Sequence, residues 1–128
     1  MVLPKIFIVD DHLLFRSGIK LLIEYSNIGK VIGEASNGQL FIEAIGKSMP
    51  DIVLMDIDMP IMNGIQATKL AIQEYPYLKI IVLSTIGEKH YADMIEAGAK
   101  GFILKTSGPE ELINAIEQVI QGEAYFSK

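Results

Sequence analysis

The sequence contains no cysteine, which excludes disulfide bonds and thiolate metal sites. It also lacks any apolar run near the ~20 residues that are needed to span a bilayer, and residues 1–5 do not resemble a signal peptide. An excess of positive charge is absent too, because the formal net charge is −5, whereas a nucleic-acid-binding surface is expected to be basic. These absences predict a cytoplasmic protein that contacts neither a membrane nor DNA directly.

What the chain does have is the composition of an ordinary globular domain. Its 128 residues are 50% hydrophobic and 21% charged, so enough apolar surface is available to form a core. The sequence shows no internal repeat and no linker-like stretch. We therefore expect one domain that spans residues 1–128.

Short apolar runs alternate with amphipathic helical patterns along the chain. The apolar runs predict strands at residues 6–9, 31–35, 52–55, 80–83 and 102–104. The helical patterns follow these strands, at residues 12–25, 40–45, 65–75, 88–97 and 109–121. For the first helix, the spacing predicts an apolar face made of Leu14, Gly18, Leu21, Leu22 and Tyr25.

This alternation predicts a parallel sheet covered by helices on both faces, because right-handed crossovers place the helices that way. The fold class is therefore α/β: a flavodoxin-like (βα)5 three-layer sandwich with a five-stranded parallel sheet of order 2-1-3-4-5. In that order the first and third strands end side by side, at the edge where open α/β sheets bind ligands.

Polar residues stand at the ends of four predicted strands. They are Asp10 and Asp11 after the first strand, Asp56 after the third, Ser84 after the fourth and Lys105 after the fifth. Three carboxylates brought together repel one another unless a cation lies between them or one of them is protonated. Oxygen ligands suit a hard cation, and Mg²⁺ is the natural candidate. The two histidines, His12 and His90, are far apart in the sequence and are expected at the surface.

This set of side chains suits phosphoryl transfer to a carboxylate. Asp56 would attack the phosphorus and become an acyl phosphate. The cation and Lys105 would neutralise charge on the phosphoryl oxygens, and Ser84 would donate a hydrogen bond to one of them. Each residue alone has an ordinary explanation, as a helix cap, a strand end or a surface lysine. Their joint placement favours the chemical interpretation.

The same residues belong to motifs that cover essentially the whole chain. The chain resembles the receiver domain of two-component response regulators in Val9-Asp10-Asp11, the run from Asp56-Ile57-Asp58-Met59-Pro60 to Gly64, Ser84, Gly98-Ala99-Lys100-Gly101-Phe102, and Lys105. It is similar to the NarL/FixJ (LuxR-type) branch in Asp10-Asp11-His12, in Arg16-Ser17-Gly18, and in residues 122–127.

The resemblance implies a signalling domain rather than an enzyme, in which Asp56 accepts a phosphoryl group from a sensor histidine kinase. It implies Mg²⁺ on Asp11, Asp56 and the backbone carbonyl of Asp58, with Asp10 in support. Lys105 would contact the phosphoryl group.

The resemblance also implies a switch, in which Ser84 moves towards the phosphoryl group and acts with the aromatic Phe102 to shift a two-state equilibrium. Phe102 has a plain interpretation as well, as a core residue of the fifth strand. This branch carries a C-terminal helix-turn-helix domain. We therefore expect residues 1–128 to be excised from a longer transcription regulator that binds DNA only through that absent domain and forms a homodimer on phosphorylation.

Two departures from the family pattern leave details open. Thr106 follows Lys105 where many receivers have a cis proline, and a non-proline cis bond costs ~2.5–4 kcal/mol, which makes a trans bond the default. The segment from Ser84 to Gly98 is one residue shorter than is usual in the branch, so either Ser84 or Thr85 is the switch hydroxyl.

Three other functions compete with this one. Met55-Asp56-Ile57-Asp58 superficially resembles a haloacid dehalogenase motif, which would indicate a Mg²⁺-dependent phosphohydrolase, but the Gly-Thr expected next is absent. An FMN carrier is disfavoured because the acidic loop after the first strand would repel phosphate. A receiver-like interaction module that is not phosphorylated stays open. If Asp56 is phosphorylated, the apolar Ile86, at the rim of the site with Asp58, predicts slow hydrolysis of the acyl phosphate.

Overall fold

The computed structural model describes residues 2–85 and 90–126. Within these ranges the predicted alternation of strands and helices is present, and no helix is long and apolar enough to cross a membrane. The strands are β1 (Lys5–Val9), β2 (Lys30–Ala35), β3 (Ile52–Asp56), β4 (Lys79–Ser84), β5 (Gly101–Leu104) and β6 (Tyr125–Phe126). The helices are α1 (Leu13–Tyr25), α2 (Gly38–Ile45), α3 (Gly64–Glu74), α4 (Tyr91–Ala97) and α5 (Pro109–Ile120).

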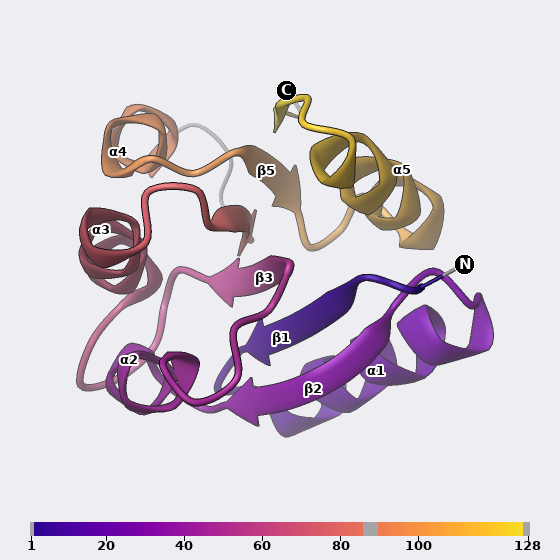
Figure 1. The fold of residues 1–128 in the computed structure, drawn as a ribbon, viewed down its shortest axis with the longest axis horizontal. Helices are drawn as coiled ribbons and strands as arrows, with labels where there is room; N and C mark the ends of the chain where they lie inside the picture. Colours follow the sequence, from indigo (N-terminus) through magenta and orange to yellow (C-terminus); the bar gives the residue numbers. More distant parts are fainter. Residues whose placement is uncertain (1, 86–89, 127–128) are drawn as a thin grey trace.

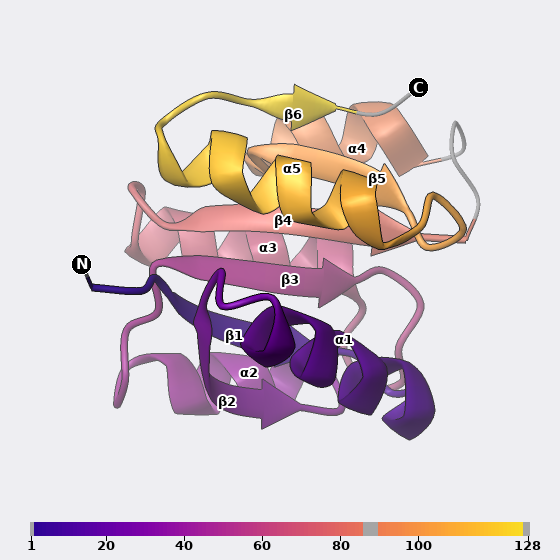
Figure 2. The ribbon, with the colours of Figure 1, turned by 90° about the vertical axis from the view of Figure 1, so that its right-hand side faces the viewer.

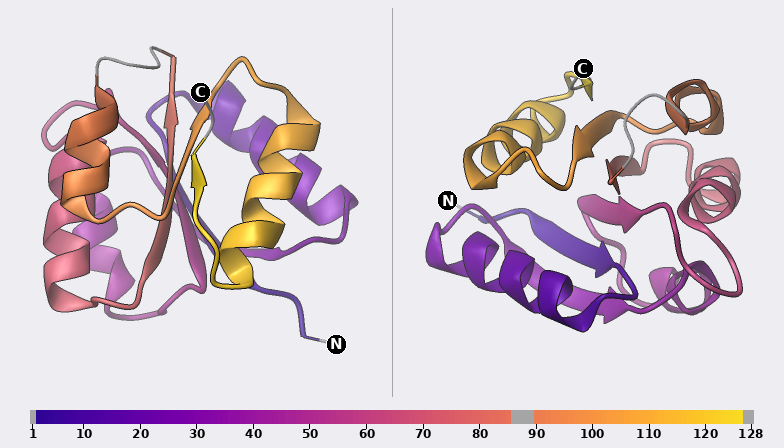
Figure 3. Two further views of the ribbon diagram at one scale, coloured as in Figure 1. Left: turned by 90° about the horizontal axis from the view of Figure 1, so that it is seen from above. Right: turned by 180° about the vertical axis from the view of Figure 1, so that it is seen from behind.

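The strands form one sheet of order β2-β1-β3-β4-β5-β6, and every neighbouring pair is parallel. Helices α1 and α5 cover one face of the sheet, and α2, α3 and α4 cover the other, which makes three layers (Figures 1 and 3). The layered α/β architecture and the order of the first five strands confirm the predicted fold.

The central strands are buried on both faces. In β3, Ile52 and Leu54 pack into the core beneath α1 and α5, whereas Val53 and Met55 pack into the core beneath α2, α3 and α4. All four side chains are fully buried. Burial on both faces explains why the sequence shows an uninterrupted apolar run before Asp56 rather than an alternating pattern.

The apolar face predicted for α1 is wrong except at Leu22, which is half-buried and packs against the core. Leu14, Leu21 and Tyr25 lie on the surface, with exposed fractions of 89%, 69% and 95%. The helix instead packs through Ile19 and Ile23, which are buried in the core that α1 shares with α5. Because α1 carries large apolar residues on more than one face, periodicity alone could not identify the face that meets the sheet.

A sixth strand extends the sheet beyond the five that the sequence predicts. β6 pairs in parallel with β5, with Tyr125 opposite Gly101 and Phe126 opposite Phe102 (Figure 2). The chain turns back after α5 at Gly122, whose φ of 96° favours glycine. A strand of two half-buried residues is too short to produce a recognisable apolar run.

Candidate functional site

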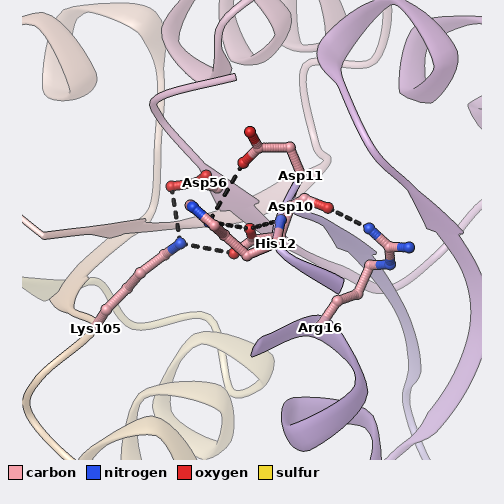
Figure 4. A network of polar contacts seen from close by, with 6 residues as sticks. All are labelled: Asp10, Asp11, His12, Arg16, Asp56 and Lys105. Atoms are coloured by element: carbon pink, nitrogen blue, oxygen red, sulfur yellow. Dashed lines mark hydrogen bonds and ion pairs between the residues drawn. The ribbon is translucent and has the colours of Figure 1, made fainter. Parts of the chain in front are cut away.

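Five polar side chains converge at the carboxyl edge of the sheet (Figure 4). Asp10, Asp11 and His12 follow β1, Asp56 is the last residue of β3, and Lys105 follows β5. The sequence predicted the meeting of the aspartates and the lysine, because β1 lies next to β3 and parallel strands end at a common edge.

Lys105 connects the two buried carboxylates. Its Nζ lies 2.8 Å from Asp10 Oδ2 and 3.2 Å from Asp56 Oδ1, and it also lies 4.5 Å from the centre of the Phe15 ring. Only 8% of the lysine side chain is exposed, so solvent screens these contacts weakly. One ammonium group therefore offsets part of the charge of two carboxylates and contacts one oxygen of each.

Asp56 keeps its second oxygen without a partner. The residue is 3% exposed, and its Oδ2 accepts no hydrogen bond from any residue that the structure describes. Burial is the main cause that raises the pKa of Asp56 to about 6; the charge of Asp10 raises it further, and Lys105 opposes both effects. Asp56 is thus mostly ionised at pH 7 and has a lone pair available on the oxygen that Lys105 does not contact.

Asp11 and His12 complete the cluster on its solvent side. His12 Nδ1 lies 3.1 Å from Asp10 Oδ1 and 3.4 Å from Asp11 Oδ1, and the His12 backbone N–H donates to Asp10 Oδ1 at 2.8 Å. His12 is exposed, as expected, but its contact with the carboxylates was not anticipated. One ligand atom from each of Asp10, Asp11, His12 and Asp56 lies within 4.8 Å of the others.

Arg16, in the first turn of α1, holds the loop after β1 in place. Its guanidinium donates to the backbone carbonyl of Asp10, and its Nε pairs with Glu34 Oε1 at 2.9 Å. Since Glu34 lies in β2, these contacts connect the loop to a neighbouring strand. This structural role of Arg16 was not predicted, although Arg16 stands one helical turn after His12 and its side chain can therefore reach back over that loop.

The loop after Asp56 turns sharply back over the end of β3. The Gly64 backbone N–H donates to the carbonyl of Ile57 at 2.8 Å, and a Cβ at position 64 would lie 1.9 Å from the backbone oxygen of Asp56. This close approach requires glycine. Asp58 lies in the same loop with an exposed side chain.

Ser84 and Thr85 differ in their surroundings. Ser84 ends β4 and is buried, whereas Thr85 is exposed. The Ser84 carbonyl accepts a hydrogen bond from the Lys105 backbone N–H at 2.8 Å, so these two residues occupy neighbouring strand ends. The Lys105–Thr106 bond is trans, since the described ranges hold no cis peptide bond. Ile86, on which the predicted slow hydrolysis depends, lies outside those ranges.

Phe102 is a buried core residue of β5, which confirms its plain interpretation. Its ring packs edge-to-face on Tyr91 with centroids 5.5 Å apart, and Tyr91 packs on Phe126 with centroids 5.9 Å apart. This aromatic cluster, made of Tyr91, Phe102 and Phe126, joins α4, β5 and β6. A switching role for Phe102 stays a prediction.

The donor set fits a divalent cation. The buried Asp56 Oδ2 lacks a partner among the described residues, and ligand atoms of Asp10, Asp11 and Asp56 lie within 4.8 Å of one another. Carboxylate oxygens are the ligands that hard divalent ions prefer. The edge of the sheet therefore combines a metal-binding group of side chains with a buried lysine and a carboxylate that has a free lone pair.

Known proteins resemble this chain in sequence. Among curated proteins, YdfI of Bacillus subtilis is 44% identical over 119 residues, which cover 92% of this chain and 55% of that protein. DegU of Brevibacillus brevis is 39% identical over 123 residues, which cover 95% of this chain and 52% of that protein. Both are named transcriptional regulatory proteins, and the chain spans about half the length of each.

A solved structure agrees with these relatives. The LuxR-family two-component response regulator from Aurantimonas sp. SI85-9A1 superposes with a TM-score of 0.91 at 33% identity, covering 96% of this chain and 89% of that one. A family model described as the response regulator receiver domain matches residues 6–117. The chain therefore belongs to the response regulator receiver domain family, in its NarL/FixJ (LuxR-type) branch.

Proposed function

We propose that this chain is the phosphoacceptor part of a transcription regulator, and that Asp56 accepts a phosphoryl group from a sensor histidine kinase. One observation carries the proposal: the buried Asp56 offers an oxygen, Oδ2, that has no partner among the described residues, while Lys105 lies 3.2 Å from its other oxygen. A nucleophile needs an available lone pair, and an incoming phosphoryl group needs positive charge beside that nucleophile. Asp56 and Lys105 supply these two requirements.

The proposed transfer exchanges one bond to phosphorus for another. Asp56 Oδ2 attacks the phosphorus of a phosphohistidine, and an O–P bond forms as the P–N bond breaks. The departing imidazole keeps the electron pair and takes up a proton from water. Because the pKa of Asp56 is about 6, the carboxylate is ionised and nucleophilic at pH 7. Lys105 lies close enough to neutralise charge on the phosphoryl oxygens.

The residues that would hold Mg²⁺ are Asp11, Asp56 and the backbone carbonyl of Asp58, with Asp10 in support. When bound, the ion would supply further positive charge to the phosphoryl oxygens. The chain itself orients the carboxylates: Lys105 contacts one oxygen of Asp10, and Arg16 donates to the Asp10 backbone carbonyl. These contacts support a site that is arranged before any ligand arrives.

For the response to phosphorylation, we assign the switch hydroxyl to Ser84 rather than Thr85. Ser84 is buried at a strand end beside Lys105, whereas Thr85 points to solvent. A shift of Ser84 would alter the packing around Phe102. Since Phe102 has no hydroxyl, its response would depend on its ring contacts with Tyr91.

The place of the chain in its pathway follows from the same proposal. We infer that residues 1–128 form the receiver part of a longer cytoplasmic regulator, and that a separate helix-turn-helix domain contacts the DNA. The net charge of −5 supports assigning DNA contact to another domain. We further propose that phosphorylation promotes a homodimer.

The test is the intact mass of the protein after incubation with acetyl phosphate and Mg²⁺. Wild type should gain one phosphoryl group, and Asp56→Asn should gain none. Asp93→Asn, which changes an exposed aspartate on α4, serves as the matched control and should gain one group like wild type. Omission of Mg²⁺ should abolish the gain.

Each other result contradicts a named part of the proposal. No gain in folded wild type would favour an interaction module that is not phosphorylated, and a gain that survives in Asp56→Asn would identify a different acceptor. Catalytic turnover of small phosphate esters would indicate a phosphohydrolase. A phosphoprotein that decays rapidly would contradict the slow hydrolysis predicted from the apolar Ile86.

A further inference from the structure

We propose that His12 is itself a metal ligand, and that its ring nitrogen makes this site prefer Zn²⁺, a borderline ion, over the hard ion Mg²⁺. The inference rests on the cation site of the proposed function, but it concerns a residue outside the ligand set named there. A site built from carboxylate and carbonyl oxygens alone favours hard ions. An imidazole nitrogen shifts the preference towards the later first-row metals.

The distances in the cluster are those of ligands that share one ion. Ligand atoms about 2.1 Å from a metal lie about 3.0 Å apart when they are adjacent in an octahedron and about 3.4 Å apart in a tetrahedron. His12 Nδ1 lies 3.1 Å from Asp10 Oδ1 and 3.4 Å from Asp11 Oδ1. The ring nitrogen therefore lies at the distances from these two carboxylates that adjacent ligands of one ion would have.

A second observation indicates that a ligand belongs beside His12. Asp56 is 3% exposed, and its Oδ2 has no hydrogen-bond partner in the described part of the chain. Lys105 contacts Asp10 Oδ2 and Asp56 Oδ1. Asp10, Asp11, His12 and Asp56 each offer one ligand atom, and these atoms lie within 4.8 Å of one another. Asp56 thus has one oxygen beside the lysine and one, Oδ2, left for a cation.

The backbone of His12 makes two hydrogen bonds, and these fix the position from which its ring extends towards the cluster. Its N–H donates to Asp10 Oδ1, and its carbonyl accepts the first hydrogen bond of α1, from Arg16 N at 3.0 Å. His12 stands at the N-cap of α1, yet its side chain makes no capping hydrogen bond. The imidazole therefore faces the carboxylates instead of the helix end (Figure 4).

A simpler role for His12 is to donate a hydrogen bond to the two aspartates. That role and the ligand role predict different results. Loss of a hydrogen bond would change the affinity for Mg²⁺, Mn²⁺ and Zn²⁺ in the same direction and to a similar extent. Loss of a nitrogen ligand would lower the affinity for Zn²⁺ selectively, because the harder ions Mg²⁺ and Mn²⁺ gain less from nitrogen.

The experiment is calorimetric titration of the folded protein with Mg²⁺, Mn²⁺ and Zn²⁺, using wild type, His12→Gln and His90→Gln. Glutamine keeps an amide donor but offers no imidazole, and His90 is the other histidine of the chain. Wild type and His90→Gln should bind Zn²⁺ at least about tenfold more tightly than Mg²⁺. His12→Gln should lose about tenfold of that preference, in line with the loss of one ligand.

Pulsed electron paramagnetic resonance of the Mn²⁺ complex gives a direct readout. A nitrogen coupling should be present in His90→Gln and absent in His12→Gln. An unchanged metal preference together with no nitrogen coupling in wild type would overturn the inference. If Asp11→Asn still abolishes binding of all three ions in that case, the proposed metal site stands without His12. If wild type binds none of the ions, both the inference and the metal part of the proposed function fail.

Discussion

Lys105 and Asp56 form a buried ion pair in which each side chain stabilises the charge of the other. Lys105→Ala removes the ammonium that lies within 3.2 Å of both Asp10 and Asp56. Breaking a buried ion pair on one side leaves an uncompensated charge, so we expect a loss of about 2–4 kcal/mol in the free energy of unfolding at pH 8.

That loss should be smaller at pH 5, where Asp56, with a pKa of about 6, takes up a proton. Urea unfolding at the two pH values measures it. Lys100→Ala, at an exposed position, should cost little at either pH. An equal loss at both pH values would show that the charge of Asp56 does not depend on Lys105.

Asp56 also makes the metal-free protein sensitive to pH. Its pKa is 3.8 in the unfolded chain and about 6 in the folded one. Between these values the folded state holds a proton that the unfolded state has lost, so stability falls as the pH rises from about 4 to about 6. Above pH 6 that loss is complete.

Asp56→Asn removes this effect. With a metal chelator present at pH 7, the variant should be more stable than wild type by about 1–2 kcal/mol, less than the full shift because Lys105 loses its ion pair with Asp56. At pH 4 the difference should nearly vanish. Thermal unfolding measures both values, and a variant less stable than wild type at pH 7 would contradict the prediction.

At the scale of single residues, the sequence predicts the acidic and basic members of the site but not their supports. Asp10, Asp56 and Lys105 stand at strand ends, so the fold alone brings them together. The contacts of Phe15 and His12 depend on how α1 is rotated and on side-chain torsions that no spacing reveals. These contacts are set by short-range geometry, which the order of apolar and polar residues in the sequence does not encode.

At the scale of elements, α1 shows where sequence periodicity reaches its limit. The helix has apolar residues around much of its circumference, and the face with the most favourable spacing lies in solvent. Only the packing against β1 and the neighbouring strands decides which residues are buried. The same rotation places Arg16 over the loop that carries Asp10.

A matched pair of substitutions tests the buried face. Ile23 is fully buried, whereas Leu21 is 69% exposed. Ile23→Ala should cost about 2–4 kcal/mol, because it removes buried methyl groups and leaves a cavity. Leu21→Ala should cost less than about 0.5 kcal/mol. Urea unfolding measures both, and the reverse order would mean that α1 packs through the face first predicted from its sequence.

The short strand β6 protects the edge of β5. The Tyr125 N–H donates to the carbonyl of Lys100 at 3.0 Å, and Phe126 packs on Tyr91. Phe126→Ala removes that ring contact and should release β6 from the sheet. Hydrogen exchange measured by mass spectrometry should then become faster in residues 101–104 and 125–126, with little change in β1 and β3. Glu123→Ala, at an exposed position nearby, should leave the exchange unchanged.

At the scale of the whole molecule, the fold was predictable because one simple pattern repeats along the chain. Runs such as Ile52–Met55 mark strands buried on both faces, and the helices between them require parallel pairing. β6 was not predicted because it is stabilised by pairing with β5. Two residues are too few to form a recognisable strand pattern in the sequence.

Binding of a divalent ion should stabilise the whole chain, because the folded state arranges carboxylates that the unfolded state leaves apart. At a free Mg²⁺ concentration of ten times the Kd, the gain should be about 1.4 kcal/mol, which corresponds to a rise of several degrees in Tm. Differential scanning fluorimetry with Mg²⁺ and with a chelator measures the rise. Asp11→Asn should abolish it, and an equal rise in that variant would mean that the ion binds elsewhere.

The direction of β6 also decides what stands beside the site. Because β6 runs parallel to β5, the polypeptide reaches Phe126 while travelling towards the edge that carries Asp56, whereas β1 begins at the opposite edge (Figure 2). A fluorescent protein fused after β6 would therefore lie near the edge of the sheet from which a kinase approaches Asp56. One fused before β1 would leave that edge accessible. For this molecule, the choice of fusion end is a choice about access to the carboxylates.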